Sequence, residues 1–316
     1  MTATMPQGAE PIPRSRPPAP LLAGMVAWVA ATVLLPAPLA ARILLLAPLV
    51  MVPRLIPLLP RRRWVGALGG RPSLLAALPL LAAFSLPTGP VAAAFALPWL
   101  VVAFVGTAAA IAHGLSRLPS ILQARQLPAL GTDVALGFWG VAASFAIIDR
   151  LGLDTGFSPV IVLLTATHFH FAGFGLLGLA SLLAASRPWL RLSVLGLIVG
   201  IPITAAGFVL TSDPINAIGA LVVGSSGIGV AIALLTGRTR GTGGWVSKAA
   251  GIALLVGMPM GMAWSLAILT SQTFLDLDTM IRTHGVLNAM AVLIAVASYP
   301  ASDDSMLLRS SERPRP

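Results

Sequence analysis

Three histidines are the residues of this chain whose presence is hardest to explain by packing alone. His168 and His170 stand near the middle of a long apolar run, in the string Thr-His-Phe-His-Phe-Ala that begins at Thr167. His284 opens the last apolar run and is followed four residues later by Asn288. Ionisable side chains are costly inside a membrane and usually mark a functional site. The pattern therefore predicts a polar site within membrane segments.

Helical spacing predicts how these side chains are directed. Positions two apart differ by about 200° around a helix axis, so His168 and His170 cannot both face one ligand. We expect His168 to face a cavity and His170 to contact a neighbouring helix, while simple hydrogen bonding of both inside the bundle is the alternative. His284 and Asn288 are four apart and share a face. The predicted substrate-binding or proton-relay residues are His168, His170, His284, Asn288, Thr167 and Arg282, the last spaced to pair with Asp278.

The composition indicates a membrane protein. Of the 316 residues, 57% are hydrophobic and only 9% are charged, whereas a soluble domain carries about 25% charged residues. The expected surroundings of the chain are therefore a lipid bilayer. The chain has no cysteine, which excludes disulfides, thiolate metal sites and iron–sulfur clusters. A bound metal or haem would need histidine, methionine or carboxylate ligands.

Ten apolar runs are candidates for membrane-spanning helices, each of which needs roughly 20 residues. We predict an all-α, polytopic bundle of about ten helices over residues 21–299, with a disordered tail at 1–20 and a short tail at 300–316. Pro53 and Arg54 interrupt the second run, and the third is short. The runs are 21–38, 43–59, 73–89, 91–113, 130–148, 158–185, 188–210, 214–236, 246–270 and 284–299.

The basic residues predict the orientation of this bundle. Cytoplasmic loops of membrane proteins carry an excess of lysine and arginine. With both termini in the cytoplasm, every basic residue except Arg42, Arg150 and Arg282 falls on the inner side. The net charge of +10 is thus explained by topology, and we do not expect nucleic acid as a partner. The expected location is the bacterial plasma membrane, crossed many times.

Other polar and small residues inside the runs allow several readings. The eighth run is expected to be broken at Gly224–Gly229, as in transporters that expose backbone dipoles, although a close helix crossing is the more conservative alternative. Met258 and Met262 share a face and could bind copper(I), but filling space beside a proline is the simpler role. His113 and Asp133 could pair across adjacent helices.

The two histidine motifs support a family resemblance. The strings Thr-His-Phe-His-Phe-Ala from Thr167 and Thr-His-Gly-Val-Leu-Asn-Ala from Thr283 resemble the bacterial YndJ-like integral membrane family. The hydropathy profile fits this family over roughly residues 20–300. Because members are often described as transporters, the resemblance implies an inner-membrane helix bundle with a histidine site and favours transport, without supplying a substrate or a reaction.

Two functions follow as hypotheses. The first is a transporter-like protein whose histidine-lined polar site opens toward the outer side and handles an unknown small molecule or ion, with no cofactor. The alternative is a haem- or copper-binding redox protein, with His168, His170 and His284 as ligands. The different depths expected for the four histidines argue against a haem held between two helices. No recognised catalytic constellation occurs, so the sequence does not favour an enzyme.

Overall fold

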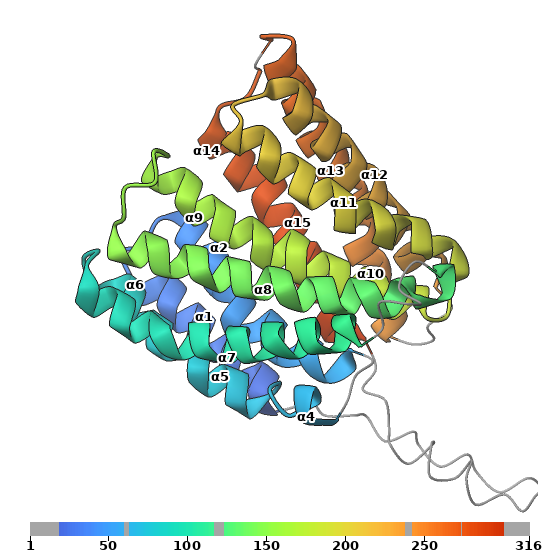
Figure 1. Ribbon diagram of the computed structural model, residues 1–316. Helices are drawn as coiled ribbons and strands as arrows, with labels where there is room; N and C mark the ends of the chain where they lie inside the picture. The colour runs from blue at the N-terminus through green and yellow to red at the C-terminus, as the bar shows by residue number, and fades with distance from the viewer. Residues whose placement is uncertain (1–18, 60–62, 117–122, 238–241, 273, 300–316) are drawn as a thin grey trace, which may run out of the picture.

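The chain folds into helices, and the part that the structure describes contains no strand (Figure 1). The structure is a computed structural model, and it describes residues 19–59, 63–116, 123–237, 242–272 and 274–299. The all-helical fold class predicted from the sequence is confirmed. The predicted tails lie outside the described residues, except that α1 already begins at Ala19.

The elements are given in chain order, with π-helical and 3₁₀ segments labelled η. They are α1 (Ala19–Leu34), α2 (Leu39–Leu46), η1 (Ala47–Met51), α3 (Val52–Leu55), η2 (Ile56–Leu58), α4 (Arg63–Gly66), α5 (Arg71–Ala77), α6 (Pro79–Ser85), α7 (Pro90–Leu115), η4 (Ala124–Gln126), α8 (Leu127–Leu151), α9 (Pro159–His168), η5 (Phe169–Leu176), α10 (Leu177–Ala184), η6 (Pro188–Leu190), α11 (Arg191–Val209), α12 (Asp213–Thr236), α13 (Thr242–Leu269), α14 (Leu277–Met280), η7 (Ile281–Gly285) and α15 (Val286–Ser298).

Among the described residues, eight helical stretches are long and apolar enough to cross a membrane. Each of them coincides with one of the ten predicted runs. The other two predicted runs appear as the shorter apolar helices Ala19–Leu34 and Arg71–Ser85. A helix of this length rises about 24 Å, which is less than the roughly 30 Å of a bilayer core. The chain is therefore a multi-pass membrane protein in which two of the ten predicted spans are short.

The helical stretch Leu39–Leu58 is the most enclosed of these spans. Its most apolar window is 83% buried, the largest share among the eight. Pro48 and Pro53 do not end it, because the backbone passes through the π-helical turn η1 and continues as α3. Proline lacks an N–H group, and a π-turn accommodates the missing hydrogen bond. The interruption predicted at Pro53 and Arg54 is therefore wrong.

Glycines bring α11 and α12 into close contact. A Cβ atom on Gly219 of α12 would lie 2.4 Å from the backbone nitrogen of Thr204 on α11. A Cβ atom on Gly207 of α11 would in turn lie 2.4 Å from the backbone nitrogen of Asn216. Small residues at such crossings let two backbones approach, which is the main source of helix association in lipid.

The same use of glycine joins α12 to α13 and corrects a prediction. Gly224 and Gly227 lie against the side chains of Met262 and Met258. The helix α12 runs without interruption from Asp213 to Thr236, so the break expected at Gly224–Gly229 is wrong. These glycines accommodate the methionine side chains, in keeping with the close-crossing alternative.

The arrangement of the helices places the histidine segments inside the bundle (Figure 1). Helices α11, α12 and α13 form one side, and α1, α5, α6 and α7 form the other, with α8, α9 and α15 between them. The stretch α2–α3 packs against α9 and α15, and α13 packs against η7 and α15. The two segments that carry the predicted site residues, α9–η5 and η7–α15, therefore both belong to the middle of the bundle.

Replacement of Gly219 by alanine tests the close packing of α11 and α12. The added methyl group would meet the backbone of Thr204, which cannot rotate away, so we expect Gly219→Ala to cost about 1–3 kcal/mol of stability. The measurement is the midpoint of heat-induced loss of the monodisperse protein in detergent. Gly137→Ala on α8 is the matched control, because its Cβ would meet nothing within 4 Å. Equal midpoints for the two variants would contradict the packing described here.

Candidate functional site

The segment that carries the first two histidines satisfies its own polar groups. Each polar side chain between residues 165 and 170 donates a hydrogen bond to the carbonyl four residues earlier. For the two histidines this bond requires a hydrogen on Nδ1, since a carbonyl oxygen can only accept. The four bonds run from Thr165 to Ile161 (2.8 Å), from Thr167 to Leu163 (2.9 Å), from His168 Nδ1 to Leu164 (2.8 Å) and from His170 Nδ1 to Ala166 (2.9 Å).

His170 is enclosed and fully bonded. Its side chain is 0% exposed, and its Nε2 accepts a hydrogen bond of 3.1 Å from the indole N–H of Trp99 on α7. The two rings stack with centroids 5.9 Å apart, and Trp139 lies edge-on to Trp99. Both ring nitrogens of His170 are therefore occupied, and the side chain joins η5 to a neighbouring helix as expected.

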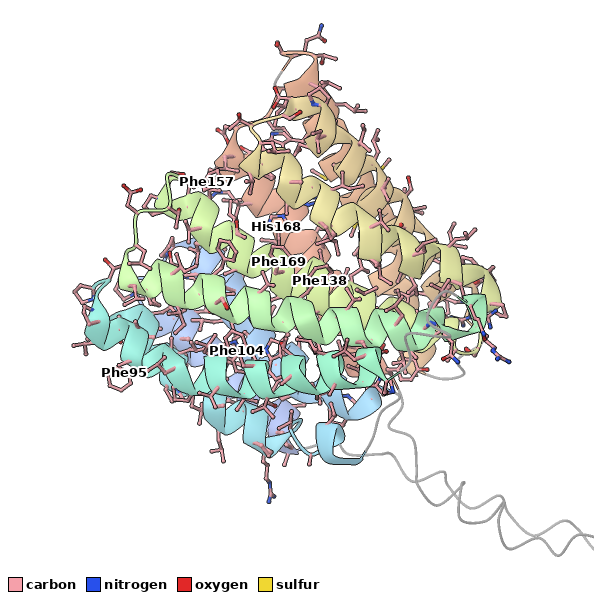
Figure 2. All side chains as sticks on the ribbon, in the orientation of Figure 1. Phe95, Phe104, Phe138, Phe157, His168 and Phe169 are labelled. Carbon is pink, nitrogen blue, oxygen red and sulfur yellow. The ribbon has the colours of Figure 1, made fainter. Side chains whose placement is uncertain are left out.

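His168 lies on the other face of the same helix. Its side chain is exposed rather than buried, and Figure 2 labels it on the last turn of α9. Because Nδ1 is held by Leu164, the lone pair of Nε2 points away from the backbone of its own helix. His168 is therefore the member of the pair that can accept a proton or a hydrogen bond from another molecule.

His284 is held by a cradle of two glycines on α13. Its Nδ1 lies 2.8 Å from the carbonyl oxygen of Gly257. A Cβ on Gly257 would lie 2.3 Å from Asn288, and a Cβ on Gly261 would lie 2.5 Å from the His284 ring. Any larger residue at these two positions would expel the polar pair. The spacing of four on α13 thus matches the spacing of four between His284 and Asn288.

The hydrogen bond from His284 also determines the tautomer. A nitrogen that faces a carbonyl oxygen at 2.8 Å must carry the hydrogen, so Nδ1 is protonated and Nε2 is a free acceptor. The side-chain amide of Asn288 lies 3.0 Å from the same Nδ1. A hydrogen on Nδ1 favours the amide orientation in which Oδ1 faces it, and this orientation gives a partner to an oxygen that is otherwise buried without one.

His168 and His284 approach one another from different helices. They are close enough for their charges to interact electrostatically. Counted from Pro159 and Leu277, where their spans begin, the two histidines lie about 13 Å and about 10 Å along the helix axes. Both imidazoles, each with a free Nε2 atom, therefore lie in the first half of their spans.

The remaining predicted residues belong to the same two helical segments as this pair, Thr167 to α9 and Arg282 to η7. Arg282 is exposed and forms an ion pair of 2.6 Å with Asp278, at the end of the helix where Asp276 accepts a hydrogen bond from the N–H of Thr279. That hydrogen bond lowers the pKa of Asp276. Thr167 is buried and back-bonded to its own helix. Neither Arg282 nor Thr167 contacts a histidine of the pair through a hydrogen bond that the structure describes.

Two other candidate groups have simpler roles. His113 Nδ1 lies 2.8 Å from a carboxylate oxygen of Asp133, across α7 and α8, as the sequence suggested. Met258 and Met262 fill the spaces at Gly227 and Gly224, as the space-filling alternative expected. Within the described ranges, no group of three histidine or acidic side chains is placed to hold a metal ion.

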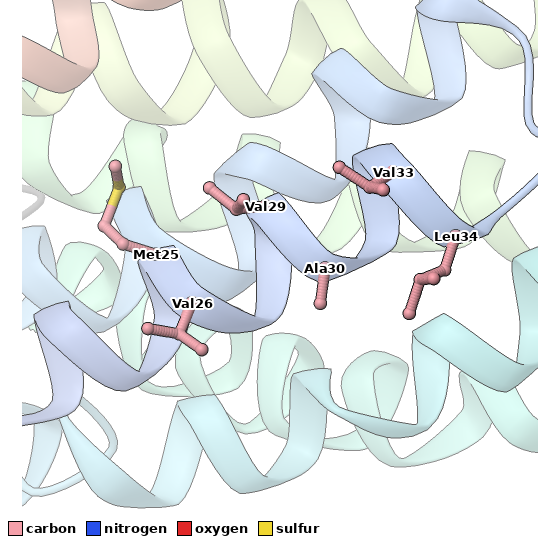
Figure 3. A pocket seen from close by; sticks show the side chains of 6 residues that line it. All are labelled: Met25, Val26, Val29, Ala30, Val33 and Leu34. Atoms are coloured by element: carbon pink, nitrogen blue, oxygen red, sulfur yellow. The ribbon is translucent and has the colours of Figure 1, made fainter.

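An apolar groove lies far from these polar groups in the sequence. It has a volume of 500 Å³ and follows the exposed face of α1 (Figure 3). All six lining residues are apolar, and several are strongly exposed, as expected for a helix face covered by lipid chains. The lining residues are Met25, Val26, Val29, Ala30, Val33 and Leu34.

Sequence reasoning missed three residues that shape the site. Gly257 and Gly261 are four apart on an apolar helix, a spacing typical of close helix contacts, and this signal could have identified them. Trp99 gave no comparable signal, because an indole N–H partner for His170 can come from any neighbouring helix.

Comparison of the chain with known proteins identifies a family. The model described as YndJ-like protein matches residues 42–292. This range includes every residue of the histidine site described above. No curated protein and no solved structure matches the chain.

The hydrogen bonds predict the tautomers of the histidines. We expect ¹⁵N spectra of the histidine-labelled protein in lipid to show three neutral imidazoles protonated at Nδ1, belonging to His168, His170 and His284. This form is the less common one for a free imidazole in water, so it requires the carbonyl partners. Single His→Gln variants assign the signals. An Nε2-protonated signal for His168 or His284 would contradict the site geometry.

Proposed function

The chain belongs to the YndJ-like protein family, and from this premise we propose that it is a transporter-like membrane protein with a substrate site at His168, His284 and Asn288. The substrate is a small molecule or ion that presents a proton or a hydrogen-bond donor to the two Nε2 atoms. His170 and Thr167 support the helix that carries His168. The site opens toward the outer side of the membrane, near the ion pair of Arg282.

One observation supports this proposal more than any other. Two imidazoles on different helices lie near enough to interact electrostatically, and each is anchored by Nδ1 so that Nε2 remains available. Imidazole has an ordinary pKa of about 6.5, so small changes in its surroundings switch its charge near neutral pH. A pair of this kind can accept a proton or a donor group and release it again. Intramembrane histidines with this property are typical of proton relays and substrate pathways.

The distribution of basic residues supports the orientation of the proposal. Both termini lie in the cytoplasm if the arginine-rich ends of the helices face inward. The ends of α8, α13 and the beginning of α14 then face outward, together with Asp149, Asp276 and Asp278. His168 and His284 both lie nearer to this outer end. The protein is accordingly proposed to function in the bacterial plasma membrane.

The haem or copper alternative has one observation in its favour. His168 and His284 belong to two different helices and lie near enough to interact electrostatically, and two axial ligands commonly come from different helices. The absorption spectrum and metal content of the purified protein separate the two functions. A stoichiometric haem band or bound copper that disappears in His168→Ala would replace the transport proposal, and a colourless protein free of haem and copper agrees with transport.

Substitution of His168 tests the proposed function directly. We expect His168→Ala to abolish the transport-dependent distribution of at least one small polar solute, because the substituted side chain has no acceptor for a proton or donor group. The measurement is untargeted mass spectrometry of cells and medium, with the variant expressed to the same level in the membrane. The control Thr236→Ala removes an exposed side chain that is likewise bonded to the carbonyl four residues earlier. Identical solute profiles for wild type and His168→Ala would contradict transport through this site.

A further inference from the structure

A second polar cluster lies at the opposite end of the bundle, where α3, α10, α12 and α15 end. Arg54 belongs to α3 and is half-buried. Its guanidinium donates a hydrogen bond from Nη2 to the backbone carbonyl of Tyr299, the residue that directly follows α15. Its Nε is buried and has no hydrogen-bond partner. The charge of Arg54 is therefore only partly compensated by the carbonyl end of one helix.

Arg187 approaches the same residue from another direction. It follows α10 and is half-buried. Burial raises the pKa of the Tyr299 hydroxyl, and the nearby charge of Arg187 opposes that rise. A Cβ on Gly237, just after α12, would lie 3.0 Å from Nη2 of Arg187. Two guanidinium groups thus converge on the end of α15, between the ends of three helices.

No described carboxylate neutralises these two arginines. Asp133 is the one acidic residue of the described ranges at this end of the bundle, and it faces His113. The other described acids lie at the opposite ends of the helices, at Asp149, Asp154, Asp213, Asp276 and Asp278. Arginines at membrane depth normally pair with an acid or a backbone group, so the described residues leave this cluster with an excess of positive charge.

Exposed tryptophans indicate that this end lies at the level of lipid headgroups. Trp189 follows Arg187 by two residues and is 48% exposed, and Trp245 near the start of α13 is 76% exposed. The ammonium group of Lys248 lies over the Trp245 ring at 5.3 Å. Tryptophan is enriched where a membrane protein meets the headgroup region. The two arginines are therefore at a depth where phosphate groups of lipids are available.

We propose that Arg54, Arg187 and Tyr299 bind the phosphate of an anionic phospholipid headgroup. Guanidinium groups bind phosphate oxygens through paired, charge-assisted hydrogen bonds. The phosphate supplies the negative charge that the described residues lack at this position, and the Tyr299 hydroxyl adds a neutral donor. Basic pockets between helix ends are suited to such lipids. The lipid would connect the enclosed stretch Leu39–Leu58 to α15 at the end remote from the histidines.

Lipid binding to the purified full chain tests the proposal. Delipidated protein in detergent is mixed with phosphatidylglycerol or phosphatidylcholine, and bound lipid is counted by native mass spectrometry. We expect phosphatidylglycerol to bind more tightly than phosphatidylcholine, and Arg54→Gln combined with Arg187→Gln to weaken it about thirtyfold, since each arginine near a lipid surface contributes roughly 1 kcal/mol. Arg187→Gln alone, which leaves the helix cap by Arg54 intact, should show part of this loss.

The control is Arg125→Gln, an exposed arginine at the same end whose Nε donates to Gln123. It removes the same charge and should leave binding unchanged. Equal binding of the two lipids to wild type, or the same loss in Arg125→Gln, would overturn the site. Full displacement of phosphatidylglycerol by inorganic phosphate at low concentration would also overturn it, because the site would then serve a free anion. Since lipid binding is measured without any transport, the outcome of this test does not depend on the proposed function.

Discussion

The hydrogen bond between His284 and the carbonyl of Gly257 is the interaction on which the rest of the candidate site depends. It crosses from η7 to α13, so it requires the two helices to lie closer than ordinary side chains allow. Gly257 and Gly261 provide that space. The same bond places a hydrogen on Nδ1 and thereby leaves Nε2 as an acceptor. Close packing and the chemistry of the imidazole are thus consequences of one contact.

Backbone carbonyl oxygens accept the hydrogen bonds that water or carboxylates accept in soluble proteins. Inside a bilayer, polar side chains must find partners within the protein. His168, His170 and the two threonines near them each use the carbonyl one turn earlier. These hydrogen bonds need no partner on a second helix, so the outer edge of each side chain remains available. His170 uses its free edge to hold Trp99, and His168 keeps its free edge open. The contrast between the two explains why neighbouring histidines of one motif have different roles.

Much of the architecture could be predicted from the sequence, because apolar length alone identifies spans. The ten runs, the pairing of His113 with Asp133 and the shared face of His284 and Asn288 followed from hydropathy and from helical spacing. The continuity of two helical stretches depended on how their neighbours pack against them and could not be predicted in this way. Proline in Leu39–Leu58 indicated an interruption, but neighbouring helices enclose this stretch and a π-turn absorbs the missing hydrogen bond. Glycines in α12 suggested a break, whereas the methionine side chains of α13 occupy the space beside them.

The position of His284 along its span also could not be predicted from the local sequence pattern. His284 lies near the beginning of its apolar run, which suggested a position close to the outer surface. The structure adds α14 before it, so that the span begins at Leu277 and His284 lies further along the helix. Its proximity to His168 depends on how α9 and η7 pack around α2, a tertiary arrangement that spacing along the chain does not encode.

Accessibility of single cysteines from the outside tests the central claim most directly, since the natural chain has none. In a cysteine-free background, His168→Cys and His170→Cys differ by two positions on one helix. A membrane-impermeant maleimide added to intact spheroplasts should label the cysteine at position 168 and leave the one at position 170 unmodified, because the former faces the proposed site and the latter is enclosed by Trp99. Protection of position 168 in correctly inserted protein, or equal labelling of both, would contradict an outward-facing histidine site.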